Sequence, residues 1–479
     1  MHDIKKGNEK AFANGKDSEL QRGLTNRHLQ LIAIGGTIGT SLFLGASKTI
    51  TVAGPSIIFA YILAGLVTFI AMRILGEMIL SNLHFRSLKD VATHYLSHGA
   101  GFMVGWLYWA FWTVTGMQDA VAVSVYLKPY FPWMPLWLPG VTVILLIFIL
   151  NSIAVGLFGE LEFWLSLIKI VAISCLIIVG AYLLISKQGY IYHFDNGASQ
   201  DLTSNVANLW ERGGFFPNGF MGFLFGFQLA FLAYTGVETV GMTAAETKDP
   251  EKTLPKAINS IPIRIALFYV GAVFVILCVV PWDAIGNSGS PFVGIFSTIG
   301  IPAASEIMTF VLVTAAVSGA NSGLYSTSRM LFGLARDGHA LKGWSKLSRN
   351  KVPVNALVFS IVIMLVPVII VSFLSSPMDA FTIFASWATV CILGVWLLIL
   401  FAYLKYLKNK PALHKSSIFP LRHGKPFAII AITFFCLIIV LMFFQTIPFI
   451  GIMLTCITAV ILYCVYKLTI SKSEHVEKL

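Results

Sequence analysis

Long apolar runs, separated by short charged or turn-forming stretches, dominate this sequence and decide the solvent in which the chain can fold. Hydrophobic residues make up 57% of the chain and charged residues only 11%, whereas a soluble protein carries about 25% charged residues. Because a run of about 20 apolar residues crosses a bilayer as a helix, we expect the solvent to be lipid. The sequence predicts twelve spans, near residues 29–50, 55–80, 101–127, 135–156, 163–186, 217–243, 262–283, 302–333, 355–375, 378–406, 427–446 and 449–468.

The distribution of basic residues predicts how these spans are oriented. The chain has 33 Lys and Arg against 22 Asp and Glu, a formal net charge of +11. With the N-terminus inside, the outer loops contain only Lys48, Lys128, Lys187 and Arg212, and cytoplasmic loops are those that collect Lys and Arg. Residues 1–27 lack the apolar core of a signal peptide. We therefore expect a multi-pass plasma-membrane protein with both termini in the cytoplasm and no nucleic-acid partner.

Two predicted spans contain residues that interrupt a helix. The first span holds Gly35, Gly36 and Gly39, and each glycine weakens a helix by about 1 kcal/mol relative to alanine. The sixth span carries the matching interruption over residues 231–238. Main chain that leaves the helix at membrane depth must be buried in protein or face water. Five spans separate the two breaks, which predicts an all-α fold of twelve transmembrane helices in a 5+5 inverted repeat, with a site between its halves.

Free main-chain groups at such breaks predict the chemistry of the ligand. The N-terminal end of a half-helix offers unpaired N–H groups to an anion, and the C-terminal end offers carbonyl groups to a cation. A small zwitterion such as an amino acid carries both charges close together, so it needs no ionic side chain. The alternative is that the glycines of the first span only allow close packing between helices.

Three ionisable residues within the predicted spans are candidate functional residues. Inserting a charged side chain there costs roughly 2.5–3.5 kcal/mol, so each is expected to have a partner or a function. Lys169, about two turns into the fifth span, can bind and release a proton or extend to the cytoplasmic interface. Asp119 in the third span can bind a substrate ammonium or line an outward vestibule. Glu238 can brace the break in the sixth span or take part in proton movement.

Other polar residues receive structural interpretations. Arg73 and Glu77 are four residues apart near the inner end of the second span, a spacing that favours an ion pair. Glu160 and Glu162 precede the fifth span and are expected to cap it. The sequence contains no Walker loop, HExxH motif or dinucleotide fingerprint, and its six cysteines lie in apolar runs without metal-site spacing. We therefore expect neither an enzyme nor a bound cofactor or metal.

Several stretches together resemble the amino acid–polyamine–organocation (APC) superfamily, specifically its bacterial amino acid transporter family. They are residues 22–40 (RGLTNRHLQLIAIGGTIGT), 159–164 (GELEFW), 244–259 (AAETKDPEKTLPKAIN) and 321–330 (NSGLYSTSRM). The likeness runs from about residue 20 to residue 470, in family order and spacing. Shorter stretches are most like permeases for D-serine, D-alanine and glycine, namely 113–117 (TVTGM), 169–173 (KIVAI), 262–265 (PIRI) and 291–293 (PFV).

The resemblance implies a ten-helix inverted-repeat core with discontinuous helices 1 and 6, two peripheral helices, and proton-driven uptake. Phe231 matches an aromatic residue that covers the bound substrate in relatives. Lys169 matches a lysine of proton-coupled relatives that occupies the position of the bound sodium ion in sodium-coupled relatives. Ser41 departs from the family, where this position is commonly glycine, so its hydroxyl either adds a donor or narrows the pocket. The resemblance places the substrate carboxylate near Thr37, Gly39, Thr40 and Ser41, and its amino group near carbonyls around Phe231, Ala233 and Tyr234.

The implied function is proton-coupled import of small neutral amino acids (D-alanine, D-serine, glycine) by alternating access, driven by the proton gradient. The partners would be the amino acid, protons and the lipid bilayer, with the chain a monomer or weak oligomer. Alternatives are a permease of the same family for aromatic, proline-like or other amino acids, an exchanger, or, in a different class, a channel or an amino acid sensor. The chain divides into an N-terminal tail (1–28), a first repeat (29–186), an extracellular loop (187–216), a second repeat (217–406), peripheral helices 11 and 12 (407–468) and a C-terminal tail (469–479).

Overall fold

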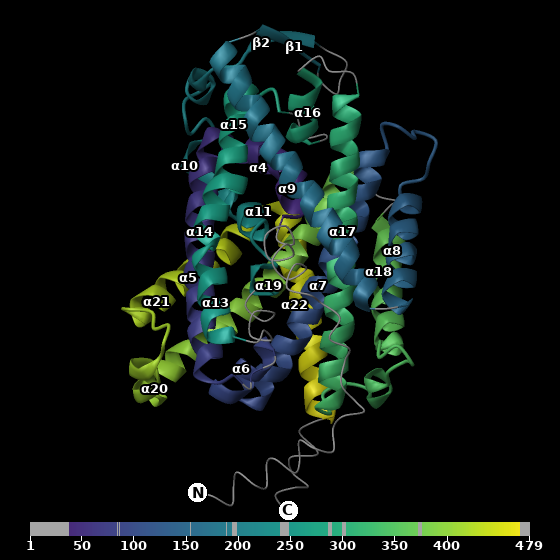
Figure 1. The fold of residues 1–479 in the computed structure, drawn as a ribbon, viewed down its shortest axis with the longest axis vertical. Helices are drawn as coiled ribbons and strands as arrows, with labels where there is room; N and C mark the ends of the chain where they lie inside the picture. The colour runs from purple at the N-terminus through teal and green to yellow at the C-terminus, as the bar shows by residue number, and fades with distance from the viewer. Residues whose placement is uncertain are drawn as a thin grey trace, which may run out of the picture.

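The computed structural model describes residues 38–83, 85, 87–153, 155–187, 189–193, 199–239, 249–285, 290–298, 303–371 and 376–469. Thr37, with Gly35 and Gly36, lies outside the described residues. The described chain is mostly helical (Figure 1). Within it, eight helical segments are long and apolar enough to cross a membrane, and two shorter apolar helices, Trp137–Ile153 and Val354–Ile370, accompany them.

Helices occupy part of each of the first six ranges in which the sequence predicts a span. The elements up to the second break are α3 (Thr40–Phe43), α4 (Gly45–Ala53), η1 (Gly54–Ser56), α5 (Ile57–Ser81), α6 (Leu88–Tyr95), α7 (His98–Leu127), α8 (Trp137–Ile153), α9 (Val155–Ser186), β1 (Gly189–His193), β2 (Ser199–Thr203), η2 (Val206–Leu209), α10 (Gly219–Phe225) and α11 (Phe227–Leu232).

The remaining six predicted ranges also overlap helices. Their elements are α13 (Pro250–Asn259), α14 (Ile261–Arg264), the π-helical turn η3 (Ile265–Gly271), α15 (Ala272–Val279), α16 (Pro291–Thr298), α17 (Ala304–Arg336), η4 (Lys342–Ser345), α18 (Val354–Val371), α19 (Pro377–Asn409), α20 (Pro411–Ser416), α21 (Gly424–Met442) and α22 (Thr446–Thr469). The helix of the tenth range, α19, therefore continues past the predicted end at residue 406.

Outside the spans, the structure contains elements that the sequence analysis did not predict. β1 and β2 form an antiparallel hairpin in which Gly189 pairs with Thr203. The hairpin lies at the top of the molecule in Figure 1, at the opposite end from α6 and α20. α6 starts with a capping box, because the Ser87 hydroxyl accepts from Asp90 N and the Asp90 carboxylate accepts from Ser87 N. The described chain is thus mostly helical, as predicted, with one small hairpin outside the spans.

α7 lies at the centre of the helix packing. It contacts both α17 and α19, while α17 also contacts α9 and α8 contacts α18. A glycine allows α17 to approach α7 closely, since a Cβ added at Gly323 of α17 would lie 3.0 Å from the Trp112 carbonyl oxygen of α7. In Figure 1, α8 and α18 form the right rim of the molecule and α5, α13 and α14 lie on the left.

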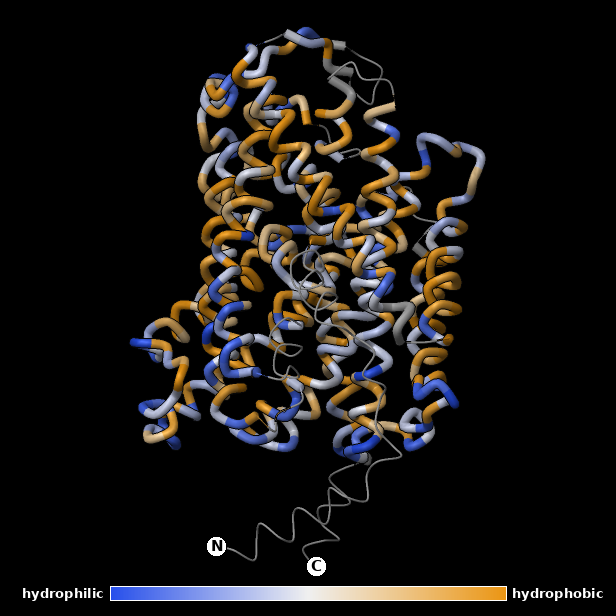
Figure 2. Tube along the Cα trace, viewed as in Figure 1, coloured by the Kyte–Doolittle hydropathy of each residue, from blue (hydrophilic) through white to orange (hydrophobic). Residues whose placement is uncertain are grey.

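The outward faces of several helices are apolar. Ile178, Tyr182 and Ile185 are exposed on α9, and Val460 and Ile461 on α22. Soluble monomers rarely expose apolar patches of this kind, so these faces suit contact with lipid chains. Figure 2 shows hydrophobic segments along the helices and hydrophilic segments gathered at the lower end of the molecule.

Candidate functional site

The first helix break lies directly before α3. Gly39 is extended (φ −124°, ψ −173°), α3 starts at Thr40, and no side chain caps the helix. The side chains of Thr40 and Ser41 are buried, so this helix end lies in the protein interior. A Cβ added at Gly39 would meet no atom of the described residues within 4 Å. Open space therefore lies beside extended main chain at the start of a buried helix, where N–H groups have no partner within the helix.

The second break follows α11. Residues 233–236 form turns, and Gly236 has φ +92°, a conformation that favours glycine. The Glu238 carboxylate accepts a hydrogen bond from Gly236 N (3.0 Å) and another from the Tyr108 hydroxyl (3.4 Å). Glu238 thus braces the interrupted segment, which is one of the two roles predicted for it. α11 packs against both α3 and α4, so the two breaks are neighbours in space.

A polar network joins the first break to α7. The Thr40 hydroxyl donates to Asp119 Oδ1, and Gln118 Nε2 donates to Thr40 Oγ1 (3.2 Å) and Ser41 Oγ (3.0 Å). Asp119 is buried rather than exposed in an outer vestibule, and its carboxylate fills the space beside Gly319 of α17. Ser41, the residue that departs from the family pattern, therefore fixes the Gln118 amide. The sequence analysis missed Gln118, whose only signal is an amide beside Asp119 in an apolar run.

A second network joins α9 to α17. Lys169 is 1% exposed, and its ammonium donates to Ser318 Oγ (2.9 Å) and lies 3.9 Å from Glu162 Oε1. The Ser318 hydroxyl in turn donates to Glu162 Oε1 at 2.5 Å. Lys169 is thus directed into the protein and does not extend to the interface. Ser318 is adjacent in sequence to Gly319, which contacts Asp119, so the two networks meet on α17.

Glu162 corrects the sequence analysis. It was expected to cap the fifth span, but α9 starts at Val155, which places Glu162 about two turns inside the helix. The turn that Glu160 and Glu162 indicated is absent, because residues 155–158 already belong to the helix. Glu162 is 0% exposed, and within the described residues its Oε2 atom has no hydrogen-bond partner. A buried carboxylate therefore lies beside the buried lysine.

The residues predicted to bind the substrate amino group lie at the second break. The Phe231 ring packs against Phe435 of α21, with 5.1 Å between centroids. The Tyr234 hydroxyl donates to the Tyr61 carbonyl oxygen (2.9 Å), and its ring lies 4.5 Å from the Tyr269 centroid. Ala233 is in the turn itself. Because both aromatic side chains contact neighbouring helices, the main chain is what this segment offers to a small ligand.

The predicted ion pair between Arg73 and Glu77 is wrong, because each side chain has another partner. Glu77 is fully buried and accepts hydrogen bonds from the Tyr403 hydroxyl (2.9 Å) and Leu421 N (2.9 Å), and it pairs with His414 Nδ1 (2.5 Å). The Arg73 guanidinium lies 3.4 Å from the centroid of the Phe419 ring and donates to the Pro420 carbonyl oxygen (3.2 Å). These contacts fasten the connection between α19 and α21 to the C-terminal part of α5.

The chain is similar in sequence to known amino acid permeases. A family model described as "Amino acid permease" matches residues 28–478. The "D-serine/D-alanine/glycine transporter" of Escherichia coli (strain K12) is 47% identical over 426 residues, covering 89% of this chain and 89% of that protein. In Bacillus subtilis (strain 168), "Amino-acid permease AapA" is 42% identical over 98% of this chain and 100% of its own length. The "Probable threonine/serine transporter YbxG" of the same organism is 41% identical over 83% of each chain.

Proposed function

Since the chain belongs to the amino acid permease family, and is therefore a multi-pass membrane transporter and not an enzyme, we propose that it is a proton-coupled permease. Its substrates would be the small neutral amino acids D-alanine, D-serine and glycine, imported by alternating access. The 47% identity over 89% of the chain to a transporter named for these three compounds supports this choice. The main support for the location of the substrate site is the pair of adjacent helix breaks at Gly39 and at residues 233–236.

The two poles of the substrate are proposed to bind main chain from the two breaks. The carboxylate lies at the start of α3, near Thr37, Gly39, Thr40 and Ser41, because this buried helix end has no side-chain cap and open space beside Gly39. The amino group lies near the carbonyls around Phe231, Ala233 and Tyr234, at the end of α11. Ser41 and Gln118 narrow the site with polar groups, which favours a small substrate.

The helix contacts support a 5+5 inverted repeat followed by two peripheral helices. If the chain repeats after five spans, α7 corresponds to α17, α8 to α18 and α9 to α19. The contact of α7 with α19 then has its counterpart in the contact of α17 with α9. Likewise, the contact of α8 with α17 corresponds to that of α18 with α7. Exchanging the two halves leaves these pairings unchanged, which is what a pseudo-twofold axis requires.

Proton coupling is proposed to involve Lys169, with Asp119 and Glu238 as further candidates. The ammonium of Lys169 is held between Ser318 and Glu162, and it interacts electrostatically with Asp119 beside the first break. A proton that enters or leaves this cluster changes the charge next to Thr40, at the proposed carboxylate site. Binding of the proton and of the substrate are thereby linked, as a symporter requires.

The proposed location is a bacterial plasma membrane with both termini in the cytoplasm. The cations of the connection between α17 and α18 (Arg336, Lys342, Lys346, Arg349 and Lys351) support this orientation, since cytoplasmic loops collect Lys and Arg. At the opposite end, Arg212 forms an ion pair with Asp283 (2.9 Å). The extracellular side would then carry the β1–β2 hairpin.

A second candidate substrate class is L-threonine and L-serine. The observation that favours it is the 41% identity over 83% of the chain to a relative named as a probable threonine/serine transporter. The hydroxyl and amide groups of Ser41 and Gln118 suit a hydroxylated side chain as well as a D-amino acid. Aromatic or proline-like substrates and obligatory exchange remain the broader alternatives.

Uptake by the purified protein in proteoliposomes tests the proposal. Labelled D-alanine should accumulate when a proton gradient directed into the vesicles is imposed, and accumulation should fall when the gradient is dissipated. Glycine and D-serine should compete for uptake, whereas L-phenylalanine and L-tryptophan should not. Competition by L-threonine and L-serine alone would move the assignment to the second candidate. Competition only by aromatic amino acids, or accumulation without a gradient, would contradict the proposal.

A further inference from the structure

A pocket opens between α4, α11, α19 and the connection that joins α21 to α22. Its lining includes Lys48 and Val52 of α4, Gln228 of α11, Thr382 of α19 and Thr446 of α22. Its volume is about 240 Å³, far above the roughly 10–15 Å³ that one water molecule needs. The pocket therefore has room for a small organic ligand.

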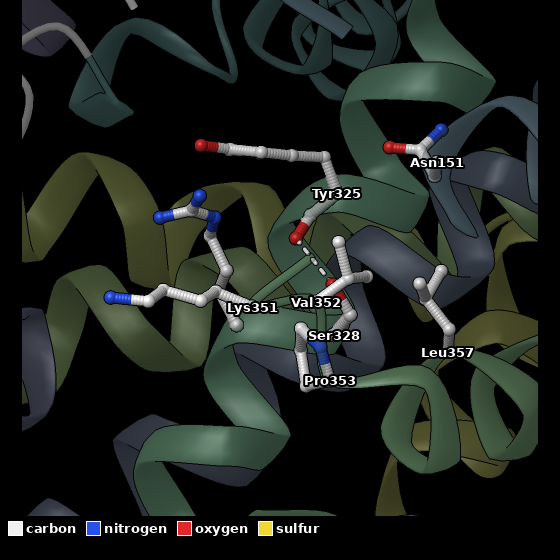
Figure 3. A pocket seen from close by; sticks show the side chains of 8 residues that line it. Asn151, Tyr325, Ser328, Lys351, Val352, Pro353 and Leu357 are labelled. Carbon is white, nitrogen blue, oxygen red and sulfur yellow. Dashed lines mark hydrogen bonds between the residues drawn. The ribbon is translucent and has the colours of Figure 1, made fainter. Parts of the chain in front are cut away.

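A second pocket, between α8, α17 and the connection before α18, has no such room. Figure 3 shows Asn151, Ser328 and Leu357 among the side chains around it. Its volume is about 10 Å³, which is room for one water molecule. Of these two pockets, only the one at α4 and α11 can receive an amino acid.

The position of this larger pocket relates it to the proposed substrate site. α4 follows the first helix break, and Gln228 precedes the turn at residues 233–236 by about one and a half helical turns. Thr446 is exposed at the rim, whereas Gln228 and Thr382 are 4% and 3% exposed and lie deeper. α4 and α10 lie in the upper half of Figure 1, towards the β1–β2 hairpin at the proposed extracellular end. The pocket that Lys48, Gln228 and Thr382 line, the outer pocket, thus lies on the extracellular side of the two breaks.

Lys48 gives the outer pocket a positive charge. Among the other cations of the predicted outer loops, Lys128 donates to two main-chain carbonyl groups and Arg212 forms an ion pair. Lys48 is half-buried, and within the described residues its side chain has no ion pair or hydrogen bond. Because an unpaired charge that is partly withdrawn from water is unfavourable, this ammonium is stabilised by an anion that enters the pocket.

Gln228 gives the outer pocket a hydrogen-bond acceptor. Its Nε2 atom donates to Ser386 Oγ (2.7 Å), and the Ser386 hydroxyl donates to the Thr382 carbonyl oxygen (2.6 Å). These bonds fix the amide, and its Oε1 atom accepts no hydrogen bond within the described residues. Oε1 is therefore the atom that Gln228 offers to a ligand, and an ammonium group is a suitable donor for it. A cation and an acceptor in one pocket match the two poles of an amino acid.

We propose that the outer pocket binds the amino acid zwitterion on its way to the two helix breaks, with the carboxylate at Lys48 and the ammonium at Gln228 Oε1. The inference rests on the proposed function and adds a second binding site to it. Both contacts involve groups that all α-amino acids share, so the outer pocket accepts the substrate class and leaves selection of the side chain to the breaks.

A site on the access route has a kinetic signature. Entry and exit use the same route, so a group that stabilises the zwitterion along it speeds association and dissociation by the same factor and leaves Kd unchanged. The contribution of a half-buried charge lies between that of an exposed ion pair and that of a buried hydrogen bond to a charged group. Its loss corresponds to about three- to tenfold in each rate constant.

Stopped-flow binding measurements on the purified full-length protein, with D-alanine as the probe, give both rate constants. Lys48→Gln should slow association and dissociation about three- to tenfold each and change Kd by less than about twofold, whereas Lys48→Arg should keep the wild-type rates. Val52→Phe, which fills the outer pocket without a change of charge, should also slow both steps. The matched control is Lys187→Gln, because Lys187 is an exposed cation of the outer loops that does not line the outer pocket. It should leave both rates unchanged.

The outcomes separate this inference from the proposed function. Unchanged rates in Lys48→Gln, or equal slowing in Lys187→Gln, would overturn the outer pocket and leave the proposed function standing. A weaker Kd with an unchanged association rate would also overturn it, since Lys48 would then belong to the proposed substrate site. If the wild type binds L-serine in place of D-alanine, the same series with L-serine should give the same pattern; binding of no amino acid would overturn both proposals. A thermal melt checks folding, and Val52→Phe decides if Lys48→Gln does not fold.

Discussion

Replacing Gly39 by alanine adds one methyl group in the place where the substrate carboxylate is proposed to lie. The extended conformation of Gly39 (φ −124°, ψ −173°) is open to any L-residue, and among the described residues no atom lies within 4 Å of an added Cβ. The change should therefore leave the free energy of unfolding nearly unaltered, or raise it by about 0.4–1 kcal/mol, because alanine lowers the conformational entropy of the unfolded chain. Any loss of function must then come from the occupied space.

The expected loss of substrate affinity follows from the hydrogen bonds to the carboxylate that the methyl group displaces. A hydrogen bond to a charged group contributes about 1.5–3 kcal/mol. Loss of one such bond from the carboxylate corresponds to an affinity about tenfold to a hundredfold weaker. Gly39→Leu fills the space completely and should abolish binding, with the protein still in the membrane.

Binding of labelled D-alanine to the purified variant, together with its melting temperature, measures both effects. Gly45→Ala is the matched control, because a Cβ at Gly45 also meets no described atom within 4 Å, but this residue is the first of α4 and lies away from the break. The control should bind D-alanine normally and melt at the same or a higher temperature. Wild-type affinity in Gly39→Ala, or equal loss in both variants, would refute the placement of the carboxylate.

Three further predictions concern the groups around the site. Lys169→Ala should remove the dependence of D-alanine uptake on the pH gradient, and Glu162→Gln should weaken it, because Glu162 lies 3.9 Å from the ammonium; unchanged pH dependence in both would contradict the coupling role. Gly236→Ala should lower the melting temperature by a few degrees, since φ +92° strains alanine by about 1–2 kcal/mol. Gly333→Ala in α17, where a Cβ meets no described atom within 4 Å, should not. Glu77→Gln should speed proteolysis within residues 411–423, because it weakens the bonds that hold this connection to α5; equal cleavage of the wild type would contradict that fastening role.

The sequence allows the family and the positions of the spans to be predicted because both depend on local pattern. The family prediction is confirmed by the match over residues 28–478. Apolar runs locate helices, and Gly236 marks the second break because its positive φ favours glycine. The hairpin of β1 and β2 was missed, although Tyr190, Ile191 and Tyr192 are typical strand residues.

Tertiary contacts explain what the sequence did not show. The spacing of Arg73 and Glu77 favours a local pair, but Glu77 is buried against Tyr403, His414 and Leu421, which are far away in the chain. Glu162 was expected to cap the fifth span because Glu160 and Glu162 indicated a turn before it, but the helix α9 starts earlier, at Val155. The partner of Lys169 on α17, Ser318, has no signal in sequence, since serine is common in membrane helices.

The most direct test of the main-chain site removes one pole of the substrate at a time and leaves the protein unchanged. Binding of D-alanine is compared with that of D-alanine methyl ester, which keeps only the ammonium, and D-lactate, which keeps only the carboxylate. If α3 and the turn after α11 each bind one pole, both analogues should compete with labelled D-alanine at least a hundredfold more weakly than unlabelled D-alanine does. Competition by either analogue within a few-fold of D-alanine would contradict the account.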